Sequence, residues 1–76
     1  LCKTVVELDL SYNNFSGMVP ESLGECSSLE LVDISYNNFS GKLPVDTLSK
    51  LSNIKTMVLS FNKFVGGLPD SFSNLL

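Results

Sequence analysis

The sequence predicts a solenoid of three stacked coils, and three observations support this fold class. One phrase recurs, as LDLSYNNFSGMVP, VDISYNNFSGKLP and MVLSFNKFVGGLP. Its spacing is even, with 24 residues from Asn13 to Asn37 and 25 from Asn37 to Asn62, and a fixed period of this size is typical of a solenoid. Apolar and polar residues alternate before each Asn, which is the pattern of a half-buried strand. We expect these strands to form a parallel sheet, with the rest of each coil as the return connection.

The length of the chain limits this solenoid to one small domain. We interpret residues 1–76 as one fragment of three repeats, at approximately 2–25, 26–50 and 51–74, without a polar cap at either end. Hydrophobic residues make up 43% of the chain, which is too many for a disordered segment. The net charge is -3 and the Lys residues are scattered, so a nucleic-acid partner is disfavoured. No apolar run approaches the roughly 18 residues of a membrane span, so we expect no membrane contact from this segment.

The strand of each coil should place alternate side chains on opposite faces. In the second coil Val32 and Ile34 should point into the core, while Asp33 and Ser35 point outward. Outward residues of successive coils form columns on the predicted concave face. The columns are Glu7, Leu31 and Thr56; Asp9, Asp33 and Val58; Ser11, Ser35 and Ser60; and, beside them, Tyr12, Tyr36 and Phe61.

An Asn closes the strand in every coil, at Asn13, Asn37 and Asn62. Its carboxamide both donates and accepts, so it can satisfy backbone groups that a buried turn would leave unpaired. It also tolerates the unusual dihedral angles of a bend. We expect the three side chains to form an internal amide ladder, and a solvated turn Asn is the alternative.

A Phe, a Gly and a Pro follow the Asn at fixed intervals. The Phe side chains should stack through the core as a spine, and Gly allows a bend that a Cβ would resist. Because the residue before Pro is extended, a second short extended segment is predicted at Val19, Leu43 and Leu68, on a different face from the first sheet. The spine is Phe15, Phe39 and Phe64, and the Gly/Pro turn is Gly17, Pro20, Gly41, Pro44, Gly66 and Pro69.

The return connection should contain a short 3₁₀ or helical turn on the convex side. Apolar residues recur there at intervals of three. They are Leu23, Leu48 and Phe72, followed by Cys26, Leu51 and Leu75. The second coil has one extra residue between Pro44 and Leu48, which accounts for its longer step.

Two cysteines occupy the same position in successive coils, at Cys2 and Cys26, where the third coil has Leu51. Because Leu replaces Cys in this column, we expect free, buried thiols. A disulfide is the alternative, since stacking brings equivalent Cα atoms within bonding range and a secreted protein would retain the bond.

Each coil follows the pattern L-x-x-L-x-L-x-x-N-x-F-x-G-x-[VL]-P-x-x-L-x-x-[CL]. It resembles the plant-type leucine-rich repeat over the whole chain, and the spacing from Gly17 to Val19-Pro20 is specific to the plant receptor subclass. The sequence of the three repeats is most similar to an internal ectodomain segment of the brassinosteroid receptor kinases. The resemblance implies a right-handed α/β superhelix on the extracellular side of the plasma membrane, within a single-pass receptor whose Ser/Thr kinase lies outside this chain. It also implies that a steroid hormone contacts only an island domain that this chain lacks.

The concave face is the usual binding surface of a solenoid, and Tyr and Phe are common interface anchors. We nevertheless expect Tyr12, Tyr36 and Phe61 to be mainly a scaffold feature, because the column recurs in every coil. Asp9 and Asp33 should oppose each other on adjacent strands. They could share a proton or hold a cation, but we expect two solvated carboxylates, because calcium needs more oxygen ligands.

Two N-glycosylation sequons begin at Asn14 and Asn38. Asn13 and Asn37 should point inward, so Asn14 and Asn38 should point outward. We expect a glycan on at least one of them in a secreted protein.

Catalysis by this chain is disfavoured. The sequence has no His to serve as a base for its Ser residues, and it has no phosphate loop or Cys/His metal cluster, so we expect no cofactor and no metal. The expected function is that of a non-catalytic scaffold or recognition segment of a plant receptor kinase. Its expected partners are neighbouring repeats and a peptide or a co-receptor ectodomain. The alternative is a generic protein-interaction module of another plant repeat protein.

Overall fold

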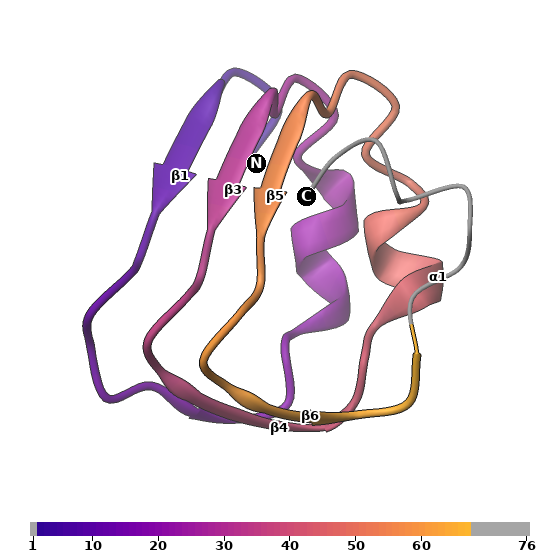
Figure 1. Cartoon of the computed structure of the whole chain (residues 1–76). Coiled ribbons are helices and arrows are strands. Elements are labelled where there is room, and N and C mark those ends of the chain that lie inside the picture. Colours follow the sequence, from indigo (N-terminus) through magenta and orange to yellow (C-terminus); the bar gives the residue numbers. More distant parts are fainter. Residues whose placement is uncertain (1, 68–76) are drawn as a thin grey trace.

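Three coils stack side by side in the computed structural model, which describes residues 2–67 (Figure 1). Each of the first two coils passes through a strand, a second extended segment and a short helical turn. The strands of neighbouring coils pair in parallel. The solenoid predicted from the repeat is therefore confirmed. No helix in this described part is long and apolar enough to cross a membrane.

The first sheet contains β1 (Glu7–Asp9), β3 (Leu31–Asp33) and β5 (Thr56–Val58), in that order. Its register matches the sequence repeat, so Val32 lies between Leu8 and Met57. Val32 and Met57 are 0% and 1% exposed, because alternate side chains of these strands point into the core. The other face of this sheet carries the outward columns.

The second sheet contains β2 (Ser16–Gly17), β4 (Asn38–Lys42) and β6 (Lys63–Val65), in that order. The prediction of an extended segment at Val19 and Leu43 is wrong in position, because these strands end before those residues. Proline has no N–H to donate to a ladder, so the pairing uses residues on its N-terminal side. The partners are also offset by two positions from the repeat, so Gly41 opposes Phe64. Leu68 and Pro69 lie outside the described residues.

The convex side carries a 3₁₀ helix, η1 (Glu21–Glu25), in the first coil and an α-helix, α1 (Val45–Leu48), in the second. The predicted short helical turn is present in both, and the extra residue of the second coil accompanies an α-turn. Gly24 lets the two turns approach closely, because a Cβ there would lie 3.0 Å from the Lys50 Cδ and 3.2 Å from the Thr47 carbonyl oxygen. Phe72 and Leu75 lie outside the described residues.

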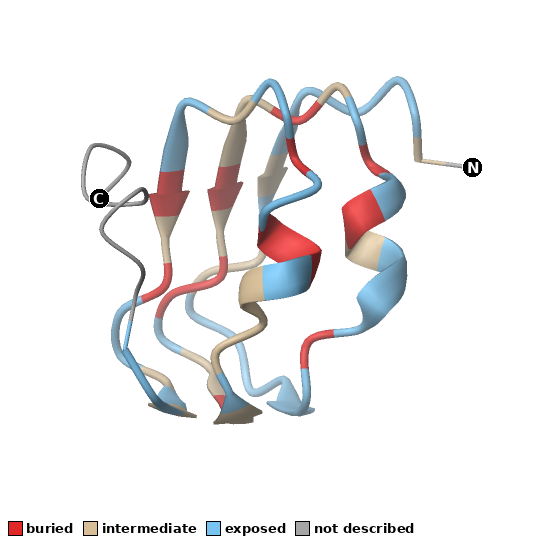
Figure 2. Cartoon of the chain, turned by 90° about the vertical axis from the view of Figure 1, so that its right-hand side faces the viewer, coloured by how far each residue is buried: buried red, intermediate tan, exposed pale blue. Residues whose placement is uncertain are grey.

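Burial is greatest in the middle coil, since it has a neighbour on each side (Figure 2). Leu29 and Leu48 are 0% and 1% exposed, whereas Phe15 in the first coil is 45% exposed. The hydrophobic core consists of Val19, Cys26, Leu29, Val32, Ile34, Phe39, Leu48, Leu51, Met57 and Leu59.

The side chains of Phe15, Phe39 and Phe64 lie in one row. Ring centroids are 6.2 Å apart for Phe15 and Phe39 and 6.4 Å apart for Phe39 and Phe64, with nearly parallel planes. These distances fall in the favourable range for aromatic neighbours. The glycines two positions later have φ of 81°, 82° and 90° at Gly17, Gly41 and Gly66. Side chains other than hydrogen are strained in this region.

The asparagines link each coil to the one before it. The Asn37 Nδ2 donates to the Leu10 carbonyl at 2.8 Å, and its Oδ1 accepts from the Phe15 N–H at 3.1 Å. Asn62 repeats both bonds one coil later, with the Ile34 carbonyl at 2.8 Å and the Phe39 N–H at 3.0 Å. Each carboxamide thus satisfies two backbone groups of its neighbour.

The asparagines of the predicted amide ladder bond to backbone groups and not to one another. The bonds that Asn37 and Asn62 make to the coil before them all run to backbone groups, and the Leu10 and Ile34 carbonyls each accept from two carboxamides, one of their own coil and one of the next. Asn13 donates only within its own coil, to the carbonyls of Leu10 and Ser11. Asn13 and Asn37 therefore have the same sequence context but different hydrogen-bond partners.

The unusual dihedral angles fall on the residue before each Asn, not on the Asn as predicted. Tyr12, Tyr36 and Phe61 have φ of 56°, 55° and 59°. This left-handed conformation costs roughly 1–3 kcal/mol for each such residue. It turns the chain so that the Asn37 Nδ2 reaches back to the Ile34 and Ser35 carbonyls. The hydrogen bonds of the Asn offset this strain.

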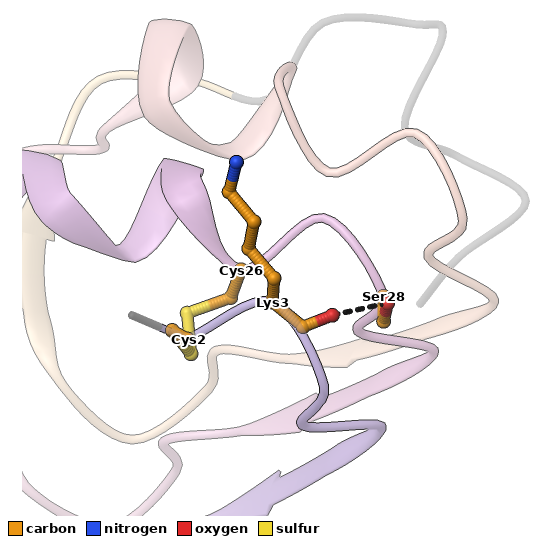
Figure 3. The surroundings of a disulfide bond; sticks show 4 residues. All are labelled: Cys2, Lys3, Cys26 and Ser28. Atoms are coloured by element: carbon orange, nitrogen blue, oxygen red, sulfur yellow. Dashed lines mark hydrogen bonds between the residues drawn. A yellow bond between two sulfur atoms is a disulfide. The ribbon is translucent and has the colours of Figure 1, made fainter.

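Cys2 and Cys26 form a disulfide between the first and second coils, with Cα atoms 4.6 Å apart (Figure 3). The prediction of free thiols is wrong. Stacking places the two Cα atoms within the usual disulfide range, and the Leu51 side chain of the next coil fills the same column by packing alone. A Leu in the column therefore does not exclude a bond between the other two members.

A further row of inter-coil hydrogen bonds lies near the disulfide. The Ser28 hydroxyl donates to the Lys3 carbonyl (Figure 3), and the Asn53 Nδ2 donates to the Ser27 carbonyl at 2.8 Å. Ser28 and Asn53 occupy equivalent positions of the repeat, which is the sequence signal that could have revealed this row. It ties the convex turns together where they return to the first sheet.

We expect Asn37→Ala to lower the free energy of unfolding by about 1–3 kcal/mol, because it removes the bond to the Leu10 carbonyl and leaves the Phe15 N–H of the preceding coil unpaired. The matched control is Asn13→Ala, which removes only bonds within one coil and should cost about 1 kcal/mol or less. Urea denaturation followed by circular dichroism measures both. Equal losses for the two variants would contradict a special role for the inter-coil bonds.

Reduction of the disulfide should lower the free energy of unfolding by about 3 kcal/mol, from the chain entropy of a closed loop spanning a separation of 24 residues. Denaturation curves with and without a reducing agent measure the difference. A Cys2→Ser/Cys26→Ser variant is the control and should not respond to the reductant. An unchanged midpoint on reduction of the wild-type chain would show that the bond adds no stability.

Candidate interaction surface

The outer face of the first sheet, here called the β1–β3–β5 face, carries the predicted columns in register. Glu7, Leu31 and Thr56 are direct partners across the three strands. Asp9 and Asp33 are also partners, and Val58 follows them in the third coil. Repeat-equivalent side chains therefore lie side by side on this face, as the alternation of the strands requires.

The two aspartates of this face bond locally. The Asp9 Oδ1 accepts from the Ser11 N–H at 3.0 Å and from the Ser11 hydroxyl at 2.6 Å, and Asp33 and Ser35 repeat both bonds at the same distances. The bonds from the Ser11 hydroxyl and N–H hold the pKa of Asp9 below its usual value of 3.8. Each of the two aspartates therefore bonds to the serine of its own coil.

The serine column differs from the predicted outward row. Ser35 is only 3% exposed, while Ser60 is exposed. Ser35 turns its hydroxyl to Asp33, and its carbonyl accepts from the Asn37 Nδ2. In the middle coil this serine therefore helps to form the bend and offers little surface to a partner. Among residues 2–67 no group of three or more His, Cys, Asp or Glu side chains could hold a metal ion.

An aromatic column borders the β1–β3–β5 face. The Tyr12 and Tyr36 ring centroids are 4.2 Å apart with planes at 9°, and those of Tyr36 and Phe61 are 4.3 Å apart at 10°. The three side chains are 73%, 40% and 66% exposed. The neighbouring Tyr36 hydroxyl raises the pKa of Tyr12. Tyr36 has a ring stacked on each of its faces, whereas Tyr12 and Phe61 are each covered on one face and remain well exposed.

An ion pair lies at the end of this face where β3 and β5 begin. The sequence pattern did not predict this pair. The Lys55 Nζ lies 3.1 Å from the Glu30 Oε1, and the Lys55 N–H also donates to the Glu30 carbonyl. The signal was present in the sequence, because Glu30 and Lys55 are separated by one repeat. Both side chains are largely exposed, so the pair adds little stability.

Charge is uneven across the β1–β3–β5 face. The first coil contributes Glu7 and Asp9, and the second contributes Asp33, whereas the third contributes Thr56 and Val58 at the equivalent positions. The face therefore changes from acidic to uncharged along the stack. Such a surface can contact a partner.

The sequon residues lie elsewhere, on the side of the second sheet. Asn14 is exposed just before β2, and Asn38 is the partly exposed first residue of β4. Lys63 occupies the same position in the third coil and is exposed. Of the prolines in the predicted Gly/Pro turn, Pro20 directly precedes η1 and Pro44 directly precedes α1, while Pro69 lies outside the described residues.

Comparison with known proteins gives close relatives among plant receptors. The chain is 97% identical over 58 residues to the systemin receptor SR160 of Solanum peruvianum, and the match covers 76% of this chain and 5% of that protein. The chain thus spans a small part of this curated relative. The predicted resemblance to an ectodomain segment of a plant receptor is confirmed.

Three solved structures of plant proteins have a fold similar to that of this chain. The plant peptide hormone receptor RGFR1, in complex with RGF2, has a TM-score of 0.85 and 36% identity, over 99% of this chain and 12% of that chain. The Arabidopsis receptor kinase HAESA, in complex with the peptide hormone IDA and the co-receptor SERK1, has a TM-score of 0.79 and 30% identity, over 88% and 11%. The BIR2 ectodomain of Arabidopsis thaliana has a TM-score of 0.77 and 31% identity, over 88% and 35%.

The sequence profile of the Leucine Rich Repeat family matches residues 4–26, 28–51 and 53–75, which is most of the chain. These segments follow the three coils of the structure. The chain belongs to the leucine-rich repeat family.

Proposed function

We propose that this chain is an extracellular segment of a plant leucine-rich-repeat receptor kinase, where it acts as a non-catalytic scaffold and makes a modest contribution to ligand recognition. The observation that carries this proposal is the in-register arrangement of exposed side chains over three hydrogen-bonded coils. A solenoid of this kind holds a continuous surface in a fixed shape. The identity to a systemin receptor supports the receptor context.

The scaffold role is favoured over a primary binding site by the aromatic column. Four of its six ring faces are occupied by stacking, so the rings of Tyr12, Tyr36 and Phe61 stabilise the succession of coils. The aspartates of this face likewise satisfy the bend of their own coil. The side chains that remain free to contact a partner are Glu7, Leu31, Thr56 and Val58.

The extracellular placement rests on the disulfide as well as on the relatives. Stable disulfides are typical of secreted proteins and are rare in the cytosol. The Cys2–Cys26 bond joins the first and second coils. We place the segment on the outer side of the plasma membrane, within a single-pass receptor.

Two ligand classes remain as proposals for the whole receptor. Peptide hormones are bound by HAESA and RGFR1 in their solved complexes, and HAESA is also bound by a co-receptor. A peptide or a co-receptor ectodomain is therefore the partner class that the β1–β3–β5 face would meet. Brassinosteroid perception is the second proposal, and the steroid would contact parts of the receptor other than this chain. A generic protein-interaction module is the alternative function.

The test uses the receptor ectodomain of SR160 with this chain in place of its own matching segment. Glu7→Ala, Leu31→Ala and Val58→Ala together remove free side chains of the β1–β3–β5 face. If these residues lie outside the main hot spot, binding of systemin, measured by titration calorimetry, should weaken by no more than about tenfold. Glu21→Ala with Asp46→Ala on the convex side is the control and should leave affinity unchanged.

Complete loss of systemin binding in the triple variant, with unchanged thermal unfolding, would make this face the primary recognition site and exclude the scaffold role. A substituted ectodomain that folds but binds neither systemin nor a brassinosteroid would argue against the receptor assignment itself.

A further inference from the structure

The chain contains two tyrosines, and the fold brings both of them to one junction. Tyr12 and Tyr36 are one repeat apart in the sequence, yet their ring centroids are 4.2 Å apart and their planes differ by 9°. Each phenol of this chain is therefore in face-to-face contact with the other. Holding two reacting groups in contact turns a chance encounter into a step within one molecule, so this pair is placed for chemistry between the two rings.

The backbone holds the two rings in the same orientation. The Tyr12 N–H donates to the Ser35 carbonyl at 3.1 Å, and the Tyr36 N–H donates to the Ser60 carbonyl at 3.2 Å. Both tyrosines have a left-handed backbone, with φ of 56° and 55°. Because equivalent bonds hold residues of the same conformation, both side chains leave the bend in the same direction. The ring carbons next to the two hydroxyl groups therefore lie side by side.

The ring pair is open to solvent. Tyr12 is 73% exposed and Tyr36 is 40% exposed, so an oxidant can withdraw an electron from either phenol in the folded molecule. Phe61 stacks on the other face of Tyr36, but its ring has no hydroxyl group and forms no phenoxyl radical. Within one molecule, Tyr12 is thus the one phenol to which Tyr36 can couple.

The disulfide is an independent observation, because a stable bond such as Cys2–Cys26 is typical of proteins from oxidising environments. We propose that Tyr12 and Tyr36 form a site of oxidative coupling, at which hydrogen peroxide acting through a haem peroxidase joins the two rings into a dityrosine bridge. This bridge would connect the first and second coils. The proposal rests on the geometry of the rings and does not depend on the receptor assignment.

The coupling balances as a two-electron oxidation. The peroxidase removes one electron and the phenolic proton from each tyrosine, which leaves two phenoxyl radicals. The two unpaired electrons then form a bond between one Cε of each ring, next to the carbon that carries the oxygen. Each of these Cε atoms gives up its hydrogen as a proton, and a proton returns to each phenolic oxygen. The two rings together lose two hydrogen atoms, and one hydrogen peroxide is reduced to two water molecules.

The bridge would join the first two coils at a second place. Cys2–Cys26 connects them beside η1 on the convex side (Figure 3), whereas the tyrosines lie beyond the ends of β1 and β3. A covalent link between distant residues restricts the unfolded chain. The coupled protein should therefore lose less of its urea midpoint than the uncoupled protein when the disulfide is reduced.

The test is oxidation of the 76-residue chain with hydrogen peroxide and a haem peroxidase at low protein concentration, followed by mass spectrometry. We expect a monomer that has lost two hydrogen atoms. Proteolytic cleavage after Glu21 and Glu25 separates the two tyrosines in the sequence. After reduction of the disulfide, the fragments with Tyr12 and Tyr36 should therefore stay joined in the coupled protein and separate in the untreated protein.

Two variants localise the bridge. Tyr36→Phe is the matched control, because it keeps a stacked ring but removes one of the two phenols, and it should give no joined fragments. Tyr12→Phe together with Phe61→Tyr moves the phenol pair to the second and third coils, where the ring centroids are 4.3 Å apart. Coupling should then return, and cleavage after Lys42 and Lys50 should leave the fragments of this new pair joined.

Separate fragments from the oxidised wild-type chain would overturn the proposal. Covalent dimers in place of the bridged monomer, with a yield that rises with protein concentration, would also overturn it, because they would come from collisions between exposed Tyr12 rings. Coupling in the wild-type chain without coupling in the shifted pair would overturn the claim that the stacking of the rings selects the site.

Discussion

The whole arrangement depends on the carboxamide that each coil extends to the backbone of the coil before it. The backbone at the bend has polar groups that the sheets leave unpaired, and burying them without partners would cost roughly 1–3 kcal/mol each. Asn37 satisfies the Leu10 carbonyl and the Phe15 N–H with one side chain. This bond pair sets the distance and direction between coils, and the Phe row and the aromatic column follow from it.

The same constraint explains why the exposed features recur. To let Asn37 reach back, Tyr36 must adopt a left-handed backbone, and its ring then stacks between Tyr12 and Phe61. The residues around the bend are thus committed to structure. Variation that can serve recognition is left to the outward positions of β1, β3 and β5, where Glu7, Leu31 and Thr56 differ completely.

Much of the fold could be predicted from the sequence because every coil repeats the same physical solution. The period gave the stacking, and alternation gave the strands and their inward residues. The errors concern relations between coils that a single repeat does not encode. The disulfide depends on the approach of Cys2 to Cys26, and the two-residue offset that pairs Gly41 with Phe64 depends on how the strands slant. Ser35 was assigned outward because alternation does not show that Asp33 draws its hydroxyl away from solvent.

The ultraviolet emission of the stacked tyrosines depends on how the coils pack. It contains no Trp and two Tyr residues, and both lie in the aromatic column. Their rings are parallel and 4.2 Å apart, so light absorbed by one phenol is shared with the other. The ultraviolet emission of the intact molecule therefore arises from a single junction, between the first and second coils. Opening of that junction would change the emission. Fraying of the third coil beyond Phe61 would leave the emission nearly unchanged.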